Sequence, residues 1–313
     1  GTYDTGDDLP VDGNTVFDIG GVSKLFTALL LAEMARKGEV SLDAPVAQYL
    51  PPDIKPPRST KPITLLDLAT HRSGLPRAAS NVDITDLNNP NRTVSAEETY
   101  KFLARYDMPR APGAAYEYSD LGYQLLAKAL AGRGHADFAT LLQAAVLDPM
   151  HLRSTRFALT DEMKSRFTIG HDGHLQPLPA APMPALLGAD ALKSSVNDLM
   201  DLVADALGLA KDPLQPAVAD MLKIRMPTDL KARQVALAWH VATIHGVEIV
   251  WENGEAPGYR SFVGLAPAKG LGVVLLSNSV NPIDDLAIHL LDPQTPLRAL
   301  HREVKANPAD FDQ

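Results

Sequence analysis

The chain has 313 residues, of which 45% are hydrophobic and 21% charged, an ordinary globular composition that allows one large domain or two interleaved ones. A formal net charge of −9 and a pI near 5.4 argue against nucleic acid as a partner, because phosphate binding needs a basic surface. Cysteine is absent, which excludes disulfides, thiolate catalysis and Cys-based zinc sites. No apolar run reaches the length of a membrane span.

The first two thirds of the chain are predicted to be mainly helical. Residues 22–37 carry apolar side chains on several faces and are followed by Gly38, which indicates a helix buried on most sides with a glycine C-cap. A proline-dense loop follows. Further helices are predicted at 63–74, closed by Gly74, at 95–105, at 119–132, capped by Ser119 or Asp120, and within 189–207.

After residue 235 the pattern changes to that of strands. Strand-like segments occupy 235–244, 247–251, 260–266 and 271–278, with turn signals at His245-Gly246 and at 267–270, so an antiparallel meander is predicted. A last helix near 283–291 is expected to cover one face. A proline-rich stretch at 175–188 is predicted to be a surface loop. Helices followed by a run of strands are typical of an antiparallel sheet with helices segregated around it.

Three short segments carry a family resemblance. They are "GVSK" at 21–24, "YSD" at 118–120 and "ENGEAPGY" at 252–259, the last assigned to the start of the "RSFVGLA" strand. They resemble, in order, the S-x-x-K, Y-x-N and K-T-G (or His-first) elements of the serine β-lactamase and penicillin-binding-protein superfamily. The branch is that of class C β-lactamases, D-peptidases and β-lactamase-like carboxylesterases. Longer segments such as "PITLLDLATHRSGLP" and "PGAAYEYSDLGYQLLA" are similar to the same family.

The resemblance implies a β-lactamase-like α/β fold of the α+β type, an antiparallel sheet flanked by helices. Residues 1–49 and 190–313 would form the sheet-containing region, and 50–189 a mostly helical region. A family protein would begin with a helix and strands that the start of this chain lacks. An open sheet edge that invites pairing with another chain is therefore one expectation.

The resemblance also implies a mechanism in which a serine forms an acyl-enzyme that water hydrolyses. Lys24 would be the base, Tyr118 the proton carrier, and the backbone N–H groups of Gly21 and Glu255 the oxyanion hole. However, the nucleophile's position holds Gly21. No serine has lysine three residues after it, and Ser23 is about 100° from Lys24 around a helix. The chain as written lacks a nucleophile.

Two explanations of Gly21 are open. An engineered Ser→Gly change would leave the other parts intact, whereas natural loss would give a binding or regulatory protein. A lysine in an apolar helix costs free energy without a partner, so its retention favours a recently or deliberately disabled site.

Two further departures from the family pattern bear on the substrate. Asp120 replaces the family asparagine, and could either hold Lys24 charged, making it a poor base, or serve only as a helix N-cap. Glu252 stands where the family usually has a cation, so it would repel the carboxylates of penicillins, cephalosporins and peptide C-termini. Taken alone, Glu252 would be a solvated charge at a strand end. Asn253 and Gly254 are expected to line the substrate edge.

Other candidate residues are assigned structural roles. "HDGH" at 171–174 is predicted to be a solvent-facing turn rather than a metal site, because of its proline-rich setting. His71 falls in a segment that is a structural loop in the family. Trp239 and Trp251 are expected in the core or in a cleft wall. Neither a metal nor an organic cofactor is implied.

The sequence therefore predicts serine acyl transfer to water on a small ester, amide or lactam substrate, with this chain inactive because of Gly21. An ester or small peptide-like amide is favoured over a lactam because of Glu252. The alternatives are a class C-type β-lactamase and a natural pseudoenzyme that binds a peptidoglycan-like or acyl ligand. The compartment stays open: periplasmic or secreted proteins are common in the family, and a cytoplasmic one is compatible with the sequence.

Overall fold

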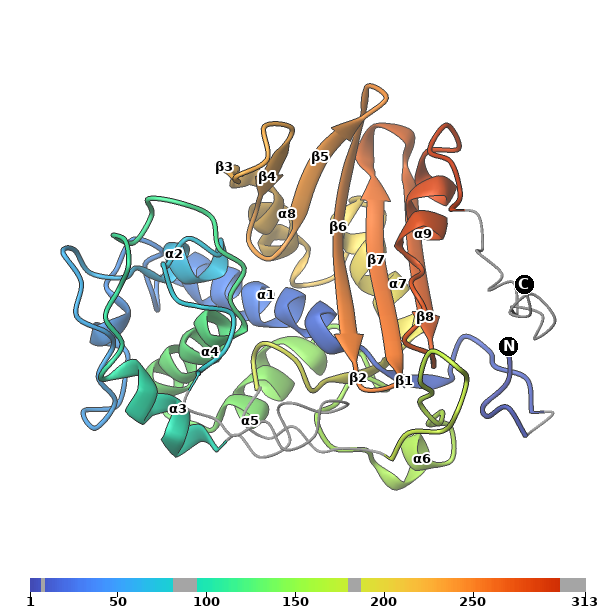
Figure 1. Cartoon of the computed structure of the whole chain (residues 1–313), viewed down its shortest axis with the longest axis horizontal. Helices are drawn as coiled ribbons and strands as arrows, with labels where there is room; N and C mark the ends of the chain where they lie inside the picture. The colour runs from blue at the N-terminus through green and yellow to red at the C-terminus, as the bar shows by residue number, and fades with distance from the viewer. Residues whose placement is uncertain (7–8, 81–94, 180–186, 299–313) are drawn as a thin grey trace, which may run out of the picture.

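The computed structural model describes residues 1–6, 9–80, 95–179 and 187–298. A six-stranded antiparallel sheet and a mostly helical region meet along one long helix, α1, which runs between them (Figure 1). The helices are α1 (Ser23–Arg36), α2 (Leu65–Ala69), α3 (Ala96–Leu103), α4 (Asp120–Gly134), α5 (Phe138–Leu142), α6 (Asp161–Lys164), α7 (Val196–Ala206), α8 (Gln215–Lys223) and α9 (Asp284–Leu291). These elements agree with the predicted α+β class, an antiparallel sheet flanked by helices beside a mostly helical region.

The sheet is a meander whose strands pair in chain order. Its strands are β3 (Met226–Pro227), β4 (Arg233–Val235), β5 (His240–Ile244), β6 (Val247–Ala256), β7 (Tyr259–Ala266) and β8 (Leu271–Ser277). Among the described residues β8 pairs with β7 alone, so it is the edge at that end of the sheet. The expectation that another chain pairs with an open edge stays a prediction.

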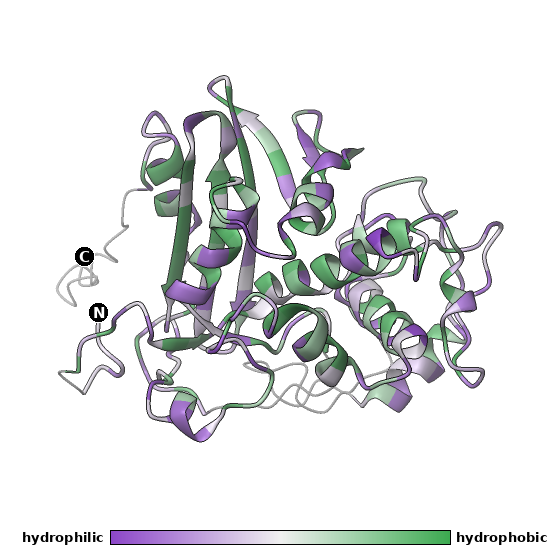
Figure 2. Cartoon of the chain, turned by 180° about the vertical axis from the view of Figure 1, so that it is seen from behind, coloured by the Kyte–Doolittle hydropathy of each residue, from purple (hydrophilic) through white to green (hydrophobic). Residues whose placement is uncertain are grey.

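Both faces of the sheet are covered by helices. On one face, a small apolar cluster that includes Ile249 and Phe262 packs against Leu291 of α9. On the other face, Val263 and Leu265 belong to the main core, which extends through α1, α4 and α7. Figure 2 shows hydrophobic residues concentrated on the strands and on α1, whereas the outer loops of the helical region are hydrophilic. One strand contributes to both apolar clusters because its successive side chains point to opposite faces of the sheet.

Helix α1 is buried because apolar side chains surround it, as predicted. Every residue of it from Ser23 to Met34 is buried. A short 3-10 turn, η1 (Gly20–Val22), leads into the helix, and a small antiparallel sheet of β1 (Val16–Asp18) and β2 (Lys193–Ser195) holds the chain before it. This two-stranded sheet places the segment before β2 beside the first turn of α1.

Several sequence interpretations need correction. The predicted helix at 63–74 covers only Leu65–Ala69, and the predicted strand at 235–244 is interrupted between β4 and β5. The "ENG" segment, residues 252–254, does not begin the "RSFVGLA" strand but lies in β6, because its cross-strand pairing to β7 outweighs its low strand propensity. Helix α4 continues to Gly134, two residues beyond the predicted end, and is followed by His135 in the left-handed conformation. Residues 180–186 of the proline-rich loop lie outside the described residues.

The prediction for the "HDGH" segment is correct in part, since Gly173 and His174 form an exposed turn. His171 is buried rather than solvent-facing, and its two ring nitrogens lie 2.9 Å from Asp4 Oδ1 and 2.8 Å from the Asn278 carbonyl oxygen. The histidine ties the N-terminal segment to the end of β8, a long-range contact that local sequence does not show. Within the described ranges no group of three or more histidine or carboxylate side chains could hold a metal ion, and no helix is long and apolar enough to cross a bilayer.

Two glycines with positive φ test how closely η1 packs on the sheet. Gly20 has φ +45, and a Cβ there would lie 2.5 Å from the Glu255 carbonyl oxygen, whereas Gly246 has φ +81 with nothing within 4 Å. We predict that Gly246→Ala costs about 1–2 kcal/mol of unfolding free energy from left-handed strain alone. Gly20→Ala should cost more than Gly246→Ala, because an overpacking penalty of about 1–3 kcal/mol is added to left-handed strain of similar size. Urea denaturation measures both, and equal losses would contradict the packing described.

Candidate active site around Lys24

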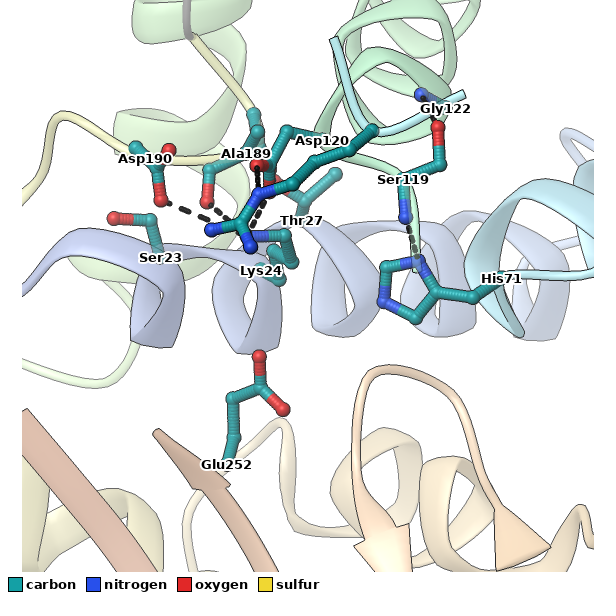
Figure 3. Close-up of polar contacts among 12 residues, drawn as sticks. Ser23, Lys24, Thr27, His71, Ser119, Asp120, Gly122, Ala189, Asp190 and Glu252 are labelled. Atoms are coloured by element: carbon teal, nitrogen blue, oxygen red, sulfur yellow. Dashed lines mark hydrogen bonds and ion pairs between the residues drawn. The ribbon is translucent and has the colours of Figure 1, made fainter. Parts of the chain in front are cut away.

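Lys24 is a fully buried cation held by oxygens from two other segments. Its Nζ lies 2.7 Å from Asp120 Oδ1 and 3.6 Å from Asp190 Oδ1, and it donates a hydrogen bond of 3.1 Å to the Ala189 carbonyl oxygen (Figure 3). Burial alone would lower the pKa of Lys24, but the negative charges of Asp120 and Asp190 outweigh it and raise that pKa well above its ordinary value. Lys24 is therefore an ammonium ion at neutral pH.

Of the two roles left open for Asp120, the structure shows the contact with Lys24, whereas the N-cap of α4 is Ser119. The Ser119 hydroxyl accepts the hydrogen bond of the Gly122 N–H, and Asp120 is the first residue of α4, where a negative charge is favoured by the helix dipole. Its carboxylate also reaches two cations, since Oδ1 faces Lys24 and Oδ2 lies 3.5 Å from Nε of Arg77.

Asp190 is a site residue that the sequence analysis missed. It lies in the segment before β2, and burial raises its pKa to about 7 although the nearby Lys24 charge acts in the opposite direction. Nothing in "LLGADALK" marks this aspartate, because its contact with Lys24 comes from chain positions 166 residues apart. The pairing of β1 with β2 and the hydrogen bond from Thr27 to the Gly188 carbonyl oxygen bring the two segments together.

Gly21 lies where the resemblance expects the nucleophile. A Cβ added to it would be 3.2 Å from Tyr118 Oη, 3.3 Å from Lys24 Nζ and 3.0 Å from the Asn253 carbonyl oxygen. Its φ is not in the left-handed region, so serine or alanine can adopt the backbone conformation with small shifts of the neighbours. Ser23 does not replace it: the Ser23 hydroxyl accepts a hydrogen bond from the Leu192 N–H and points away from Lys24 (Figure 3).

Tyr118 is held by a buried histidine. Its ring stacks on His71 with centroids 4.5 Å apart, and His71 Nδ1 accepts the hydrogen bond of the Ser119 N–H. Burial lowers the pKa of His71 well below its ordinary value, so the ring is neutral and carries its proton on Nε2. Burial likewise raises the pKa of Tyr118 well above its usual range. The Tyr118 phenol therefore stays protonated, and the stacked His71 ring holds it in position.

Glu252 is buried, not a solvated strand-end charge, because it lies on the face of β6 that points toward α1 (Figure 3). Its Oε2 is 2.9 Å from Nδ1 of His240, and Nε2 of His240 is 2.9 Å from the hydroxyl of Tyr116. The Glu252 carboxylate only accepts hydrogen bonds, so His240 Nδ1 donates to it, and burial raises the pKa of Tyr116, which keeps its phenol protonated. Glu252 Oε1 is buried without a hydrogen-bond partner.

The next three residues of β6 alternate between its two faces. Gly254 is buried against the turn η1, with its Cα so close that a Cβ would meet the Ile19 carbonyl oxygen. Asn253 and Glu255 are exposed, and their side chains bind Asp284 and Arg260 respectively. The Asn253 side chain therefore points toward α9, and the main chain of this residue faces Gly21. The roles expected for Gly21 and Glu255 N–H groups as an oxyanion hole stay predictions.

The sequence model of the family described as Beta-lactamase matches residues 1–291. The chain belongs to the Beta-lactamase family. It is 26% identical over 281 residues to the D-alanyl-D-alanine-carboxypeptidase/endopeptidase AmpH of Escherichia coli K12, covering 84% of this chain and 71% of that protein. It is also 26% identical over 309 residues to a β-lactamase of Pseudomonas fluorescens, covering 87% and 82%.

Solved structures agree with the family assignment. A class C β-lactamase from Rhodobacter sphaeroides has a TM-score of 0.77 at 25% identity, covering 90% of this chain and 85% of that one. A β-lactamase/D-alanine carboxypeptidase from Yersinia pestis has a TM-score of 0.81 at 21% identity, covering 93% and 86%, which supports the fold. The family is one of serine hydrolases, and this chain has Gly21, Asp120 and Glu252 where the resemblance expects serine, asparagine and a cation.

Asp190 predicts a pH dependence of stability. Its folded-state pKa of about 7 lies above the ordinary value of 3.8, so folding takes up a proton between these pH values and this carboxyl makes the fold less stable as pH rises through them. We predict that Asp190→Asn flattens that decline. The difference in unfolding free energy between pH 5 and pH 7.5, measured for both proteins by urea denaturation, tests it.

The control is Asp161→Asn, because that carboxylate is almost fully exposed. It should leave the pH dependence of the parent chain unchanged. If Asp190→Asn behaves in the same way as this control, the raised pKa of Asp190 is wrong.

Proposed function

We propose that this chain binds a small ligand at the Lys24 site, defined as Gly21, Lys24, Tyr118, Asp120, Asp190 and Glu252, without forming an acyl-enzyme. One observation carries the proposal. Lys24 Nζ faces three oxygens, those of Ala189, Asp120 and Asp190, and the two carboxylates keep it protonated. An ammonium ion has no lone pair, so it cannot take the proton of a hydroxyl nucleophile.

The acyl-transfer route is then blocked at two points rather than one. Gly21 supplies no hydroxyl, and Lys24 supplies no base. Tyr118 does not substitute as a base because burial keeps its phenol protonated. Restoring serine alone would leave the second obstacle in place. These features support natural loss of catalysis over a single engineered change.

A second candidate is a serine hydrolase disabled only by the loss of its nucleophile. The observation in its favour is the position of Gly21, since a serine side chain there would start between Tyr118 Oη and Lys24 Nζ, at 3.2 Å and 3.3 Å from its Cβ. Such an enzyme would cleave an ester or a small amide. The buried charge of Glu252 disfavours the carboxylate that β-lactam antibiotics carry.

Three variants distinguish the candidates: Gly21→Ser, the matched control Gly21→Ala, and the double variant Gly21→Ser/Asp120→Asn. Each is assayed with a short-chain p-nitrophenyl ester and a chromogenic cephalosporin, and intact mass spectrometry detects an acyl adduct. We predict no turnover above background for the parent chain, Gly21→Ala and Gly21→Ser. The double variant gains ester turnover about a hundredfold or more above Gly21→Ser, because loss of one of the two carboxylates lowers the pKa of Lys24 and increases the neutral fraction that can act as a base.

Two outcomes would contradict the proposed function. Full ester turnover and an acyl adduct in Gly21→Ser, unchanged by Asp120→Asn, would establish the disabled hydrolase instead. Fast cephalosporin turnover would point to a class C-type β-lactamase and remove the argument from Glu252.

A further inference from the structure

An exposed arginine lies over the Tyr118 ring of the Lys24 site. The guanidinium carbon of Arg77 lies 5.5 Å from the centroid of the Tyr118 ring, and its Nε lies 3.5 Å from Asp120 Oδ2. A cation over an aromatic face beside a carboxylate is a complementary arrangement. The Arg77 side chain is nevertheless 71% exposed, and exposed ion pairs contribute little to stability.

The side chain of Arg77 can move away from Tyr118 and Asp120, whereas its main chain is held in place. Its carbonyl oxygen accepts a hydrogen bond of 3.1 Å from the Leu121 N–H at the start of α4. The main chain is thus tied to the helix that carries Asp120. The guanidinium can rotate out of the site without any change of fold, which makes Arg77 a displaceable occupant.

Among the described residues, the site beneath Arg77 has three carboxyl groups and one buried cation. Asp120, Asp190 and Glu252 face it, whereas Lys24 is the buried cation among them and is already bound by two of these carboxylates. Glu252 adds a second, independent observation. Its Oε1 is fully buried without a donor, while Oε2 is fixed by His240, which is fixed in turn by Tyr116.

A buried carboxylate oxygen without a partner needs a donor, because leaving it unpaired costs its full desolvation penalty. The carboxylate of Glu252 extends from β6 toward the first turn of α1, where Lys24 lies (Figure 3). Its negative charge acts on both Lys24 and Tyr118, since it contributes to raising the pKa of each. The His240 ring, which binds Glu252, is also stacked 6.5 Å from the Tyr118 ring centroid, so the free acceptor and the aromatic face beneath Arg77 belong to one site.

We propose that the Lys24 site binds an organic cation, an amidinium, guanidinium or primary ammonium group, whose place Arg77 holds in the free protein. This inference rests on the ligand-binding function proposed above and names its ligand class. The ligand's cation replaces the guanidinium over Tyr118 beside Asp120, and Glu252 Oε1 accepts a hydrogen bond from it. Ligands that present a carboxylate at this place are excluded by the same charges.

Benzamidine and benzamide test the proposal, because they share a shape and differ in charge. Isothermal titration calorimetry should show benzamidine binding at least about tenfold more tightly than benzamide, the difference expected for one desolvated charged contact. Arg77→Gln removes the competitor and should tighten benzamidine binding severalfold while leaving benzamide unchanged. Glu252→Gln should weaken benzamidine binding.

The control is Arg36→Gln, which removes an arginine that pairs with Glu33 on α1 away from the site and should change neither affinity. Equal binding of the two probes, or benzamidine binding that Arg77→Gln leaves unchanged or weakens, would overturn the proposal. Arg77 is exposed, so this variant is expected to fold even if Glu252→Gln does not. Ester turnover in Gly21→Ser would overturn the proposed function separately, because the comparison of the two probes does not depend on catalysis.

Discussion

The site depends on one physical constraint, the burial of the Lys24 ammonium without access to water. A charge in a protein interior is tolerated only when it is paired and hydrogen-bonded. Here the pairing comes from two carboxylates and one carbonyl oxygen that belong to α4 and to the segment before β2. Lys24 therefore joins three parts of the chain, and Thr27 reinforces the same junction through a hydrogen bond to the Gly188 carbonyl oxygen.

The three departures from the family motifs are consistent with this constraint. Asp120 supplies the negative charge that keeps Lys24 protonated, and Gly21 leaves no hydroxyl that needs a base. Glu252 is stabilised by His240, so its charge is also accommodated. Each substitution has partners that suit it in the folded chain. A site in which only the serine had been exchanged would have kept Lys24 available as a base.

Much of the fold could be predicted from sequence because its signals are local. The all-round apolar pattern of α1 and the strand-turn-strand sequence around Gly246 depend on neighbouring residues alone. The structure brings together Gly21, Lys24 and Tyr118, which the family resemblance placed in one site, and their roles stay predictions. Asp190, Arg77 and the chain from Glu252 through His240 to Tyr116 could not be found in this way. Their contacts join distant segments, and no spacing rule connects them.

The central claim is that Lys24 is a permanent cation, and its own titration tests this most directly. Lysine labelled with ¹³C at Cε and ¹⁵N at Nζ reports the charge of each side chain by NMR, and Lys24→Met identifies the signal. The account predicts that the Lys24 resonance stays that of an ammonium ion beyond the ordinary lysine pKa of about 10.4. A Lys24 resonance that titrates to the neutral amine near pH 7 to 8 would contradict it, since Lys24 would then be available as a base.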